Sequence, residues 1–412
     1  MKYFLLALIA LLPNLLTAQE EKKEKKENKN DKYIESDVIT LGGRKGFRWE
    51  TKNGDFKLKP YMVAFTRAQA QYVDDEGLRL TEEDNIINTG FSIPVAIFGM
   101  AGTAFNRITY NIALNAAAAG SPALLNQAWI NINFKDELRL KVGKFKTPMF
   151  SNNLSRLGQK LFPSSPSSLN SPVNVPFSLN SANPHFNNGF DIGIMLHGVI
   201  NSKFAYQAGI FNGTGINVNR AKNTLSDEYN LPSLLYSARL AYMPLGKMPL
   251  HEGDPSDLDN FKMSFAISSS YSVEANYESS DDLKIAAEYS LLVNKWYFSL
   301  EAYMMRMDFV ERQKLSPDFY YYGTYAQVGY FINKKLQPIM RIDIMDRNTD
   351  KQKGNLIMPA VGFNYFIAGQ NLKLQTMYQW MIKTGYKTDA LANDDDNGLA
   401  EKQFIVQLQF AF

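Results

Sequence analysis

Positively charged side chains alternate with apolar ones in several segments of this 412-residue chain. The clearest case is the segment LRLKV at 138–142, in which Arg139 and Lys141 occupy every second position. In an extended strand, residues two apart point to the same face, so both cations would lie on one face and the apolar residues on the other. Guanidinium and ammonium groups bind anionic oxygens. The segment therefore predicts a strand with an anion-binding face.

The same alternation assigns further charged side chains to this polar face. Seven are positive and four are negative: Arg107, Arg139, Lys141, Arg239, Lys284, Arg341 and Lys373 against Asp191, Glu288, Glu301 and Asp343. One interpretation is that each charge only solvates the face and pairs with a neighbouring strand. The excess of cations, and the cluster at Arg139 and Lys141, favours an anion-selecting surface.

One histidine raises an enzymatic alternative. His197 lies in an alternating segment on the polar face, and Ser202 follows it shortly afterwards. A serine hydrolase needs a histidine beside the nucleophile and a third group that orients the histidine. A lipid-hydrolysing barrel is therefore an alternative, but one serine near one histidine is weak support. We predict no catalytic residue.

The acidic segment NDDDNG at 393–398 has the acid spacing and the glycine of a calcium loop. Its twelfth position is Phe404, so the glutamate that would bind calcium through both oxygens is missing, and an exposed acidic loop is the better interpretation. The chain has no cysteine, which excludes disulfides and thiolate metal sites. We predict neither a metal nor a cofactor.

The elements that position these residues share a period of two from residue 46 onward. The last segment, for example, places the apolar residues from Phe404 to Phe412 on one face and three glutamines on the other. Sixteen such segments follow one another: 55–73, 91–101, 105–116, 124–134, 137–147, 189–200, 203–212, 234–243, 260–271, 283–293, 296–308, 321–331, 335–346, 357–367, 371–381 and 402–412. Most are about ten residues long, which is the length that a tilted strand needs to cross a membrane.

The composition agrees with strands that face lipid on one side and water on the other. The chain has 27 Phe and 22 Tyr, yet its mean hydropathy is −0.27. This combination is typical of a transmembrane β-barrel. We therefore predict an all-β, antiparallel barrel of about sixteen strands. A short strand near 46–52 should precede it, joined to the first barrel strand by a tight Asn53-Gly54 turn.

The connections between the segments alternate in length. Short ones are 102–104, 135–136, 201–202, 294–295, 333–334 and 368–370, and long ones include 74–90, 148–188, 213–233, 309–320 and 382–401. Outer-membrane barrels have short turns in the periplasm and long loops outside. The pattern therefore predicts that both termini are periplasmic. One connection, 244–259, should be short and is not.

The longest connection, 148–188, is rich in Ser, Asn and Pro and contains no Asp or Glu. Its cations are Arg156, Lys160 and, when protonated, His185. Apolar residues that could anchor it to a barrel wall are Met149, Phe150, Leu157, Leu161, Phe162, Val173, Phe177 and Phe186. Long loops of this kind are usually functional. We predict that it folds into the barrel and narrows it, so that its cations favour anions.

The N-terminus has the pattern of an export signal. Residues 1–18 combine Lys2, an apolar run from Phe4 to Leu16 and a cleavage site after Ala18. The segment 19–43, with its mixed-charge run at 20–32, predicts a disordered tether, and 44–412 predicts the barrel. Removing Lys2 with the signal changes the formal net charge from +3 to +2, which does not indicate a nucleic-acid partner.

Two motifs resemble a known family. GFRWETKNGDFKL at 46–58 and VGKFKTP at 142–148 are similar to the opening strand and the strand-to-loop motif of the phosphate-selective porin O/P family. The resemblance implies a sixteen-stranded, homotrimeric porin in outer-membrane lipid, with a constriction loop after the fifth strand. It also implies passive diffusion of small hydrophilic solutes, with a preference for anions such as phosphate. The main alternative is an adhesin or structural barrel that binds a partner through its outer loops.

Overall fold

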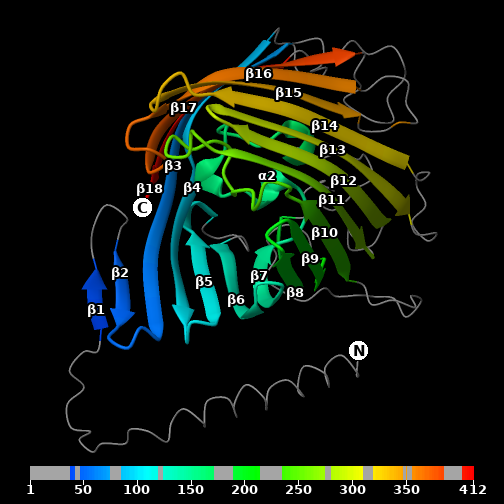
Figure 1. Ribbon diagram of the computed structural model, residues 1–412. Helices are drawn as coiled ribbons and strands as arrows, with labels where there is room; N and C mark the ends of the chain where they lie inside the picture. The colour runs from blue at the N-terminus through cyan, green and yellow to red at the C-terminus, as the bar shows by residue number, and fades with distance from the viewer. Residues whose placement is uncertain are drawn as a thin grey trace, which may run out of the picture. The chain divides into compact units, whose positions relative to one another are not determined.

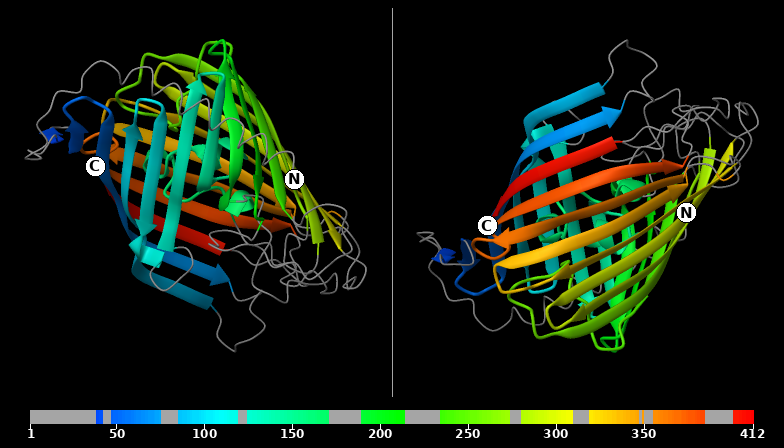
Figure 2. Two further views of the ribbon diagram at one scale, coloured as in Figure 1. Left: turned by 90° about the horizontal axis from the view of Figure 1, so that it is seen from below. Right: turned by 90° about the horizontal axis from the view of Figure 1, so that it is seen from above.

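Sixteen strands form a closed antiparallel barrel (Figure 1, Figure 2). The computed structural model describes residues 38–41, 47–74, 85–118, 124–170, 189–213, 234–273, 280–309, 319–346, 349, 355–384 and 401–412. The barrel strands are β3 (Phe56–Asp74), β4 (Asn85–Ala104), β5 (Ile108–Asn115), β6 (Leu125–Lys135), β7 (Leu138–Lys146), β8 (Phe190–Ile200), β9 (Phe204–Phe211), β10 (Leu235–Tyr242), β11 (Phe261–Ser272), β12 (Ser280–Val293), β13 (Trp296–Phe309), β14 (Phe319–Tyr330), β15 (Leu336–Asp346), β16 (Asn355–Phe366), β17 (Leu372–Thr384) and β18 (Glu401–Ala411). Each strand pairs with the next, and β18 pairs with β3, which confirms the predicted fold class.

Two short strands precede the barrel. By its internal contacts the chain divides into Met1–Ile39 and Thr40–Phe412, and the barrel lies in the second unit. β2 (Arg48–Thr51) pairs with β3 across the predicted turn, in which Gly54 has a φ of 74°. β1 (Val38–Leu41) lies in the segment predicted to be a disordered tether. The rest of that tether and the predicted signal peptide lie outside the described residues.

Burial along β15 shows the two faces of a barrel strand. The inward side chains are at most 3% exposed: Gln337, Ile339, Arg341, Asp343 and Met345. The outward side chains of Met340, Ile342 and Ile344 are apolar and 37–59% exposed. An Arg or Lys on the lipid face near the middle of the membrane would cost about 2–4 kcal/mol. The alternation therefore places both charges of this strand inside the barrel.

The turn between β4 and β5 lies further along the chain than predicted. We expected it at 102–104, but β4 continues to Ala104, and the turn is made by Phe105 and Asn106. Both have positive φ angles, 53° and 55°, as tight hairpin turns require. Arg107 closes this turn, with its backbone N–H donating to Ala104 O, and is exposed. Arg107 therefore lies in a turn and not, as predicted, in a strand.

Gly102, which we had read as a turn residue, instead allows close packing inside the sheet. A Cβ atom at this position would lie 2.1 Å from Lys57 O and 2.5 Å from the hydroxyl of Tyr110. The missing side chain lets Tyr110 lie across the neighbouring strand, where its hydroxyl donates to Lys57 O (3.2 Å). A glycine in a strand often marks such an approach rather than a turn.

Aromatic pairs gather on strand ends beside the short turns. Phe204 and Tyr242 stack with ring centroids 4.9 Å apart, and Trp296 and Tyr330 lie 4.4 Å apart. Phe204, Tyr242 and Trp296 are between 43% and 51% exposed. A girdle of exposed aromatic rings is expected where a barrel meets the membrane–water interface.

The described part of the β7–β8 connection folds into the barrel, and Figure 1 shows α2 (Ser151–Leu154) within the ring of strands. It also contains a 3-10 turn over Leu157–Gln159, η4, and a short helix, α3 (Ser167–Asn170). No helix in the described residues is long and apolar enough to span a membrane. The inward folding that we predicted for this connection is confirmed.

Two apolar clusters fasten this loop to the inner wall. Met149, Phe150 and Leu169 pack against inward side chains of β12 to β16, and Leu161 and Phe162 pack against those of β12 to β18. Four predicted anchors, at 149, 150, 161 and 162, are therefore confirmed. The anchor predicted at 157 is 37% exposed, and those predicted at 173, 177 and 186 lie outside the described residues.

The β10–β11 connection, which was too long for the predicted alternation, also folds inward. It meets the β7–β8 loop through two backbone hydrogen bonds: Arg156 N–H donates to Leu250 O (3.2 Å), and Glu252 N–H donates to Gln159 O (2.9 Å). These two connections lie at opposite ends of the strands, because three antiparallel strands, β8, β9 and β10, separate them. The lumen is therefore narrowed from both ends at once.

Candidate functional site

Two acidic side chains face each other on the inner wall. Glu288 of β12 lies directly opposite Glu301 of β13 in the strand register, and both are buried. Like charges at directly opposed positions destabilise a sheet. Both carboxylates therefore need compensating groups.

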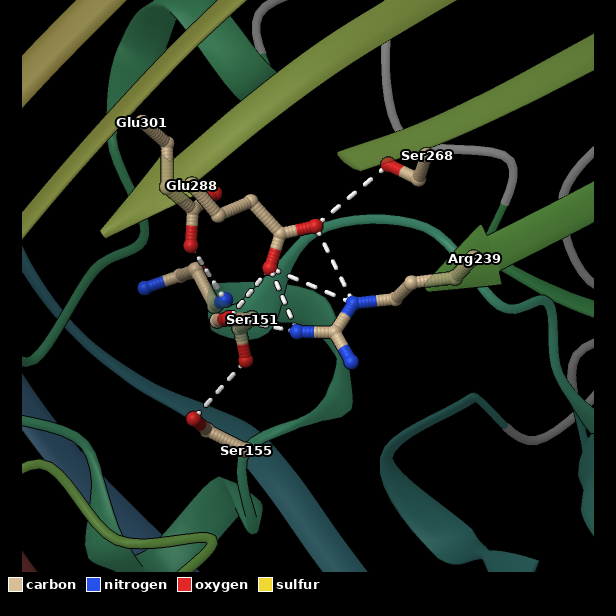
Figure 3. A network of polar contacts seen from close by, with 7 residues as sticks. Ser151, Ser155, Arg239, Ser268, Glu288 and Glu301 are labelled. Carbon is tan, nitrogen blue, oxygen red and sulfur yellow. Dashed lines mark hydrogen bonds and ion pairs between the residues drawn. The ribbon is translucent and has the colours of Figure 1, made fainter. Parts of the chain in front are cut away.

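Arg239 and the first residues of α2 supply these groups (Figure 3). Arg239 of β10 donates to Glu288 from Nη2 (2.7 Å) and from Nε (3.1 Å), and the hydroxyl of Ser151 donates to the same carboxylate. The backbone N–H of Asn152 donates to Glu301 Oε1 (2.8 Å). The constriction loop thus covers the acidic pair and helps to bind it to Arg239.

Two further carboxylates receive hydrogen bonds from the same loop. The backbone N–H of Ser168 donates to Asp343 Oδ2 (3.1 Å). Glu252, from the β10–β11 connection, accepts from Leu161 N–H (2.9 Å) and from Asn152 Nδ2 (2.9 Å). A loop without carboxylates of its own can dock on four of them without repulsion. This explains the composition that the sequence showed at 148–188.

Three predicted pore cations hold the loop in place. Arg341 Nη1 donates to Ser164 O (2.9 Å), and Lys373 Nζ donates to Lys160 O (3.0 Å). Lys160 itself donates from Nζ to Asn152 Oδ1 (2.8 Å), and burial lowers its pKa. Arg341 and Lys373 are at most 3% exposed. Arg341 and Lys373 thus contact the loop backbone, and Lys160 contacts a loop side chain.

A cavity of about 390 Å³ lies between strands β6 to β13 and the two inward connections. Its basic and histidine side chains are Arg139, Lys141, Lys146, Arg239, Lys247, His197 and His251. Within the part of the chain that the structure describes, no Asp or Glu lines it. The carboxylates of Glu288, Glu301 and Asp343 lie under the loop, and the open space beside it is cationic.

The two cations that the sequence singled out lie close to each other in this cavity. Lys141 Nζ rests 4.0 Å from the ring centre of Trp129, a favourable cation–π position. Arg139 Nη2 lies 2.5 Å from Asp136 Oδ1, but the Asp136 side chain is 84% exposed, so water screens this pair. Both side chains therefore contribute positive charge to the cavity.

The structure brings together only some of the predicted site residues. Arg139, Lys141 and Arg239 line the cavity, whereas Arg156 is exposed and Lys284 is buried on β12. Sequence reasoning missed Lys146, Lys247 and His251. The unusual length of 244–259 was the available signal for the last two, because that connection carries both into the lumen. Lys146 was out of phase with Arg139 and Lys141, so alternation could not select it.

The hydrolase alternative gains no support from these positions. His197 Nε2 hydrogen-bonds with Asn131 Oδ1 (2.6 Å), and both belong to the inner wall. Ser202 lies in the tight β8–β9 turn with a φ of 56° and is exposed. The acidic segment 393–398 lies outside the described residues.

Comparisons with known proteins agree with this geometry. The family model of phosphate-selective porin O and P matches residues 66–412. No curated protein sequence matches the chain. Its fold is similar to the outer membrane channel DcaP of Acinetobacter baumannii (12% identity, TM-score 0.53, covering 90% of this chain and 100% of that chain). It is also similar to OmpT, an outer membrane protein of Vibrio cholerae (10% identity, TM-score 0.51, covering 87% and 98%).

The identities to these solved structures are low, so they show the fold alone, whereas the family match extends over most of the chain. Barrel, inward loop and family match point to one class of outer-membrane channel. The chain belongs to the phosphate-selective porin O and P family.

Proposed function

We propose that this porin lets small hydrophilic solutes diffuse passively across the outer membrane and that it prefers anions. The observation that carries the proposal is the cavity beside the constriction loop. Basic side chains line this cavity, and no carboxylate of the described residues does. The wall carboxylates Glu288, Glu301 and Asp343 accept hydrogen bonds from the loop or from Arg239. Their charge is thereby compensated where the solute would pass.

The physical basis is a focused electrostatic field. A low-dielectric tube concentrates the potential of the charges that line it, so local anion concentration rises even though the whole chain is near neutral. Basic side chains at a narrow point are a common way for pores to favour anions and phosphate. Phosphate is the solute that the family name suggests, and a modest preference for it is part of the proposal.

The proposal includes the setting of the barrel. We place the short turns and both termini in the periplasm, since outer-membrane barrels have short periplasmic turns, and we expect a signal peptide to be cleaved after Ala18. We also expect a homotrimer. A trimer form is known for OmpT of Vibrio cholerae, whose fold is similar (11% identity, TM-score 0.50, covering 87% of this chain and 99% of that chain).

The test is the reversal potential of reconstituted channels in a KCl gradient. The wild type should be anion-selective, and the double variant Arg139→Ala with Lys141→Ala should lower the anion-to-cation permeability ratio by about twofold or more. A matched control removes two exposed turn cations, with Lys334→Ala and Lys335→Ala, and should leave the ratio unchanged.

A cation-selective wild type would contradict the anion preference. An unchanged ratio in the Arg139 and Lys141 variant would show that other residues select the ion. A folded protein without any conductance would support the adhesin alternative instead.

A further inference from the structure

Besides the two apolar clusters that hold the constriction loop, the inner wall carries a third one on strands β7 to β10. Phe145, Met195, Phe211 and Leu235 pack together and are at most 3% exposed, with Trp129 packed against them. The rings of Phe145 and Phe211 meet edge to face, with centroids 5.4 Å apart. Each of the five shares the face of its strand with a polar residue that lines the cavity. The cluster therefore belongs to the wall of the channel.

This apolar surface extends into the cationic cavity. Trp129 and Met195 line the cavity directly. Leu154 joins them from the constriction loop, and Met248 and Leu250 join them from the β10–β11 connection. Apolar side chains thus reach the cavity from the wall and from both inward connections.

The cations Lys141 and Arg139 lie next to this apolar surface. Lys141 Nζ lies 4.0 Å from the ring centre of Trp129 and 4.8 Å from that of Phe145. Arg139 lines the same cavity, and its Nε has no hydrogen-bond partner among the described residues. A ligand carboxylate at Lys141 and Arg139 would have its carbon body against Trp129.

We propose that the cavity is a transient binding site for organic carboxylates that carry an aromatic or alicyclic body. The inference rests on the proposed anion pathway and names the class of anion that the pathway favours. The carboxylate would lie at Lys141 and Arg139, and the ring would lie against Trp129 and Met195.

Cavity size and chemistry both favour such a ligand over a bare oxyanion. The cavity holds about 390 Å³, within the about 300–1,000 Å³ usual for sites that take organic ligands. Inorganic phosphate presents oxygen in every direction and binds best where donors surround it. The apolar side chains of the cavity offer it no hydrogen bond. An organic anion uses both kinds of surface.

Interruption of the chloride current through single channels in planar bilayers tests the proposal. Benzoate, acetate and inorganic phosphate would be added in turn at equal ionic strength, and the half-blocking concentration measured for each. Benzoate should block at the lowest concentration. Trp129→Leu should raise the half-blocking concentration of benzoate about two- to tenfold, the range expected for loss of one aromatic contact, and should change that of phosphate little.

The control is Trp296→Leu, which makes the same change at an outward ring that is 48% exposed. It should leave all three half-blocking concentrations unchanged. If a variant fails to fold, the half-blocking concentrations of the three anions on the wild type still test the proposal.

The outcomes separate this inference from the proposed function. A wild type that is cation-selective in the same bilayers overturns both. An anion-selective wild type that phosphate or acetate blocks at least as well as benzoate overturns only the organic-anion site. An equal shift of benzoate and acetate in Trp129→Leu also overturns it, because the ring would then act on charge alone.

Discussion

Arg239 shows how one side chain connects the acidic and the cationic sides of the lumen. It lines the cavity, yet its guanidinium is bound to Glu288 in the wall. Alternation in the sequence placed both residues on the inward face. It could not predict their pairing, because the two strands are separated by β11 and alternation gives the face of a residue without its height in the barrel.

Replacing Glu288 by Gln should increase the anion preference. The substitution removes a negative charge and frees the guanidinium of Arg239 for the cavity, where it adds to the field of Arg139 and Lys141. The reversal potential in a KCl gradient should shift towards the chloride equilibrium potential. Asp55→Asn, in the turn between β2 and β3, is the matched control. A shift in the opposite direction would mean that Arg239 does not contribute to the open cavity.

Removal of Arg239 should have the opposite effect and should also reduce stability. Glu288 would be left buried with hydroxyl donors only, and breaking a buried ion pair from one side costs about 3–5 kcal/mol. Arg239→Ala should therefore unfold at a lower denaturant concentration than the wild type. Arg139→Ala removes a cation whose partner is exposed and should change the midpoint little. Equal midpoints for both variants would contradict this interpretation.

At the scale of elements, the lumen is narrowed by two segments that hold each other. The position, composition and length of 148–188 were sufficient to predict that it folds inward. The β10–β11 connection was noticed only as an exception to the alternation of lengths. Its contact with the loop depends on Glu252 and Leu161, which are distant in sequence and which no periodic pattern relates.

Deleting residues 160–170 should raise the single-channel conductance. The deletion removes the anchors Leu161, Phe162 and Leu169 together with α3, so the loop keeps only the contacts of its first residues with the wall. Single-channel recordings in symmetrical KCl would measure the change. Leu157→Ala, at an exposed position in the same loop, should leave the conductance unchanged. A deletion variant that folds and conducts like the wild type would show that these residues do not limit the pore.

Glu252→Ala should loosen the contact between the two inward segments. Leu161 N–H and Asn152 Nδ2 lose their acceptor in a buried position, which costs about 1–3 kcal/mol for each unsatisfied group. We expect a noisier open-channel current with brief steps to higher conductance. Asp259→Ala alters an exposed acid of the same connection and should show the wild-type current. A quiet current in Glu252→Ala would mean that the loop is held by its apolar anchors alone.

For the whole molecule, the strand pattern was readable from sequence, while the shape of the passage was not. Each strand shows its own period of two, so sixteen strands could be counted without knowing their partners. Which side of the lumen stays open depends on where the loop docks. The acids of β12, β13 and β15 receive the loop, and the cations of β7 and β10 remain beside the cavity.

The anion preference should therefore decline as salt concentration rises. Screening acts within about 10 Å at 0.1 M ionic strength and within about 3 Å at 1 M, so a focused field fades while direct contacts persist. Permeability ratios measured at both concentrations would show this. A ratio that stays constant would indicate selection by direct ligation of the ion instead of by the field of the lumen.

The docking of the loop also has a consequence for the order in which the barrel is made. The loop lies between β7 and β8, but Glu252, Glu288, Glu301 and Asp343, which receive its hydrogen bonds, all follow it in the chain. Contacts across such long sequence separations form late in folding. The loop cannot dock until β12, β13 and β15 have been incorporated into the barrel wall. We expect a newly inserted barrel to conduct ions before it becomes selective for anions.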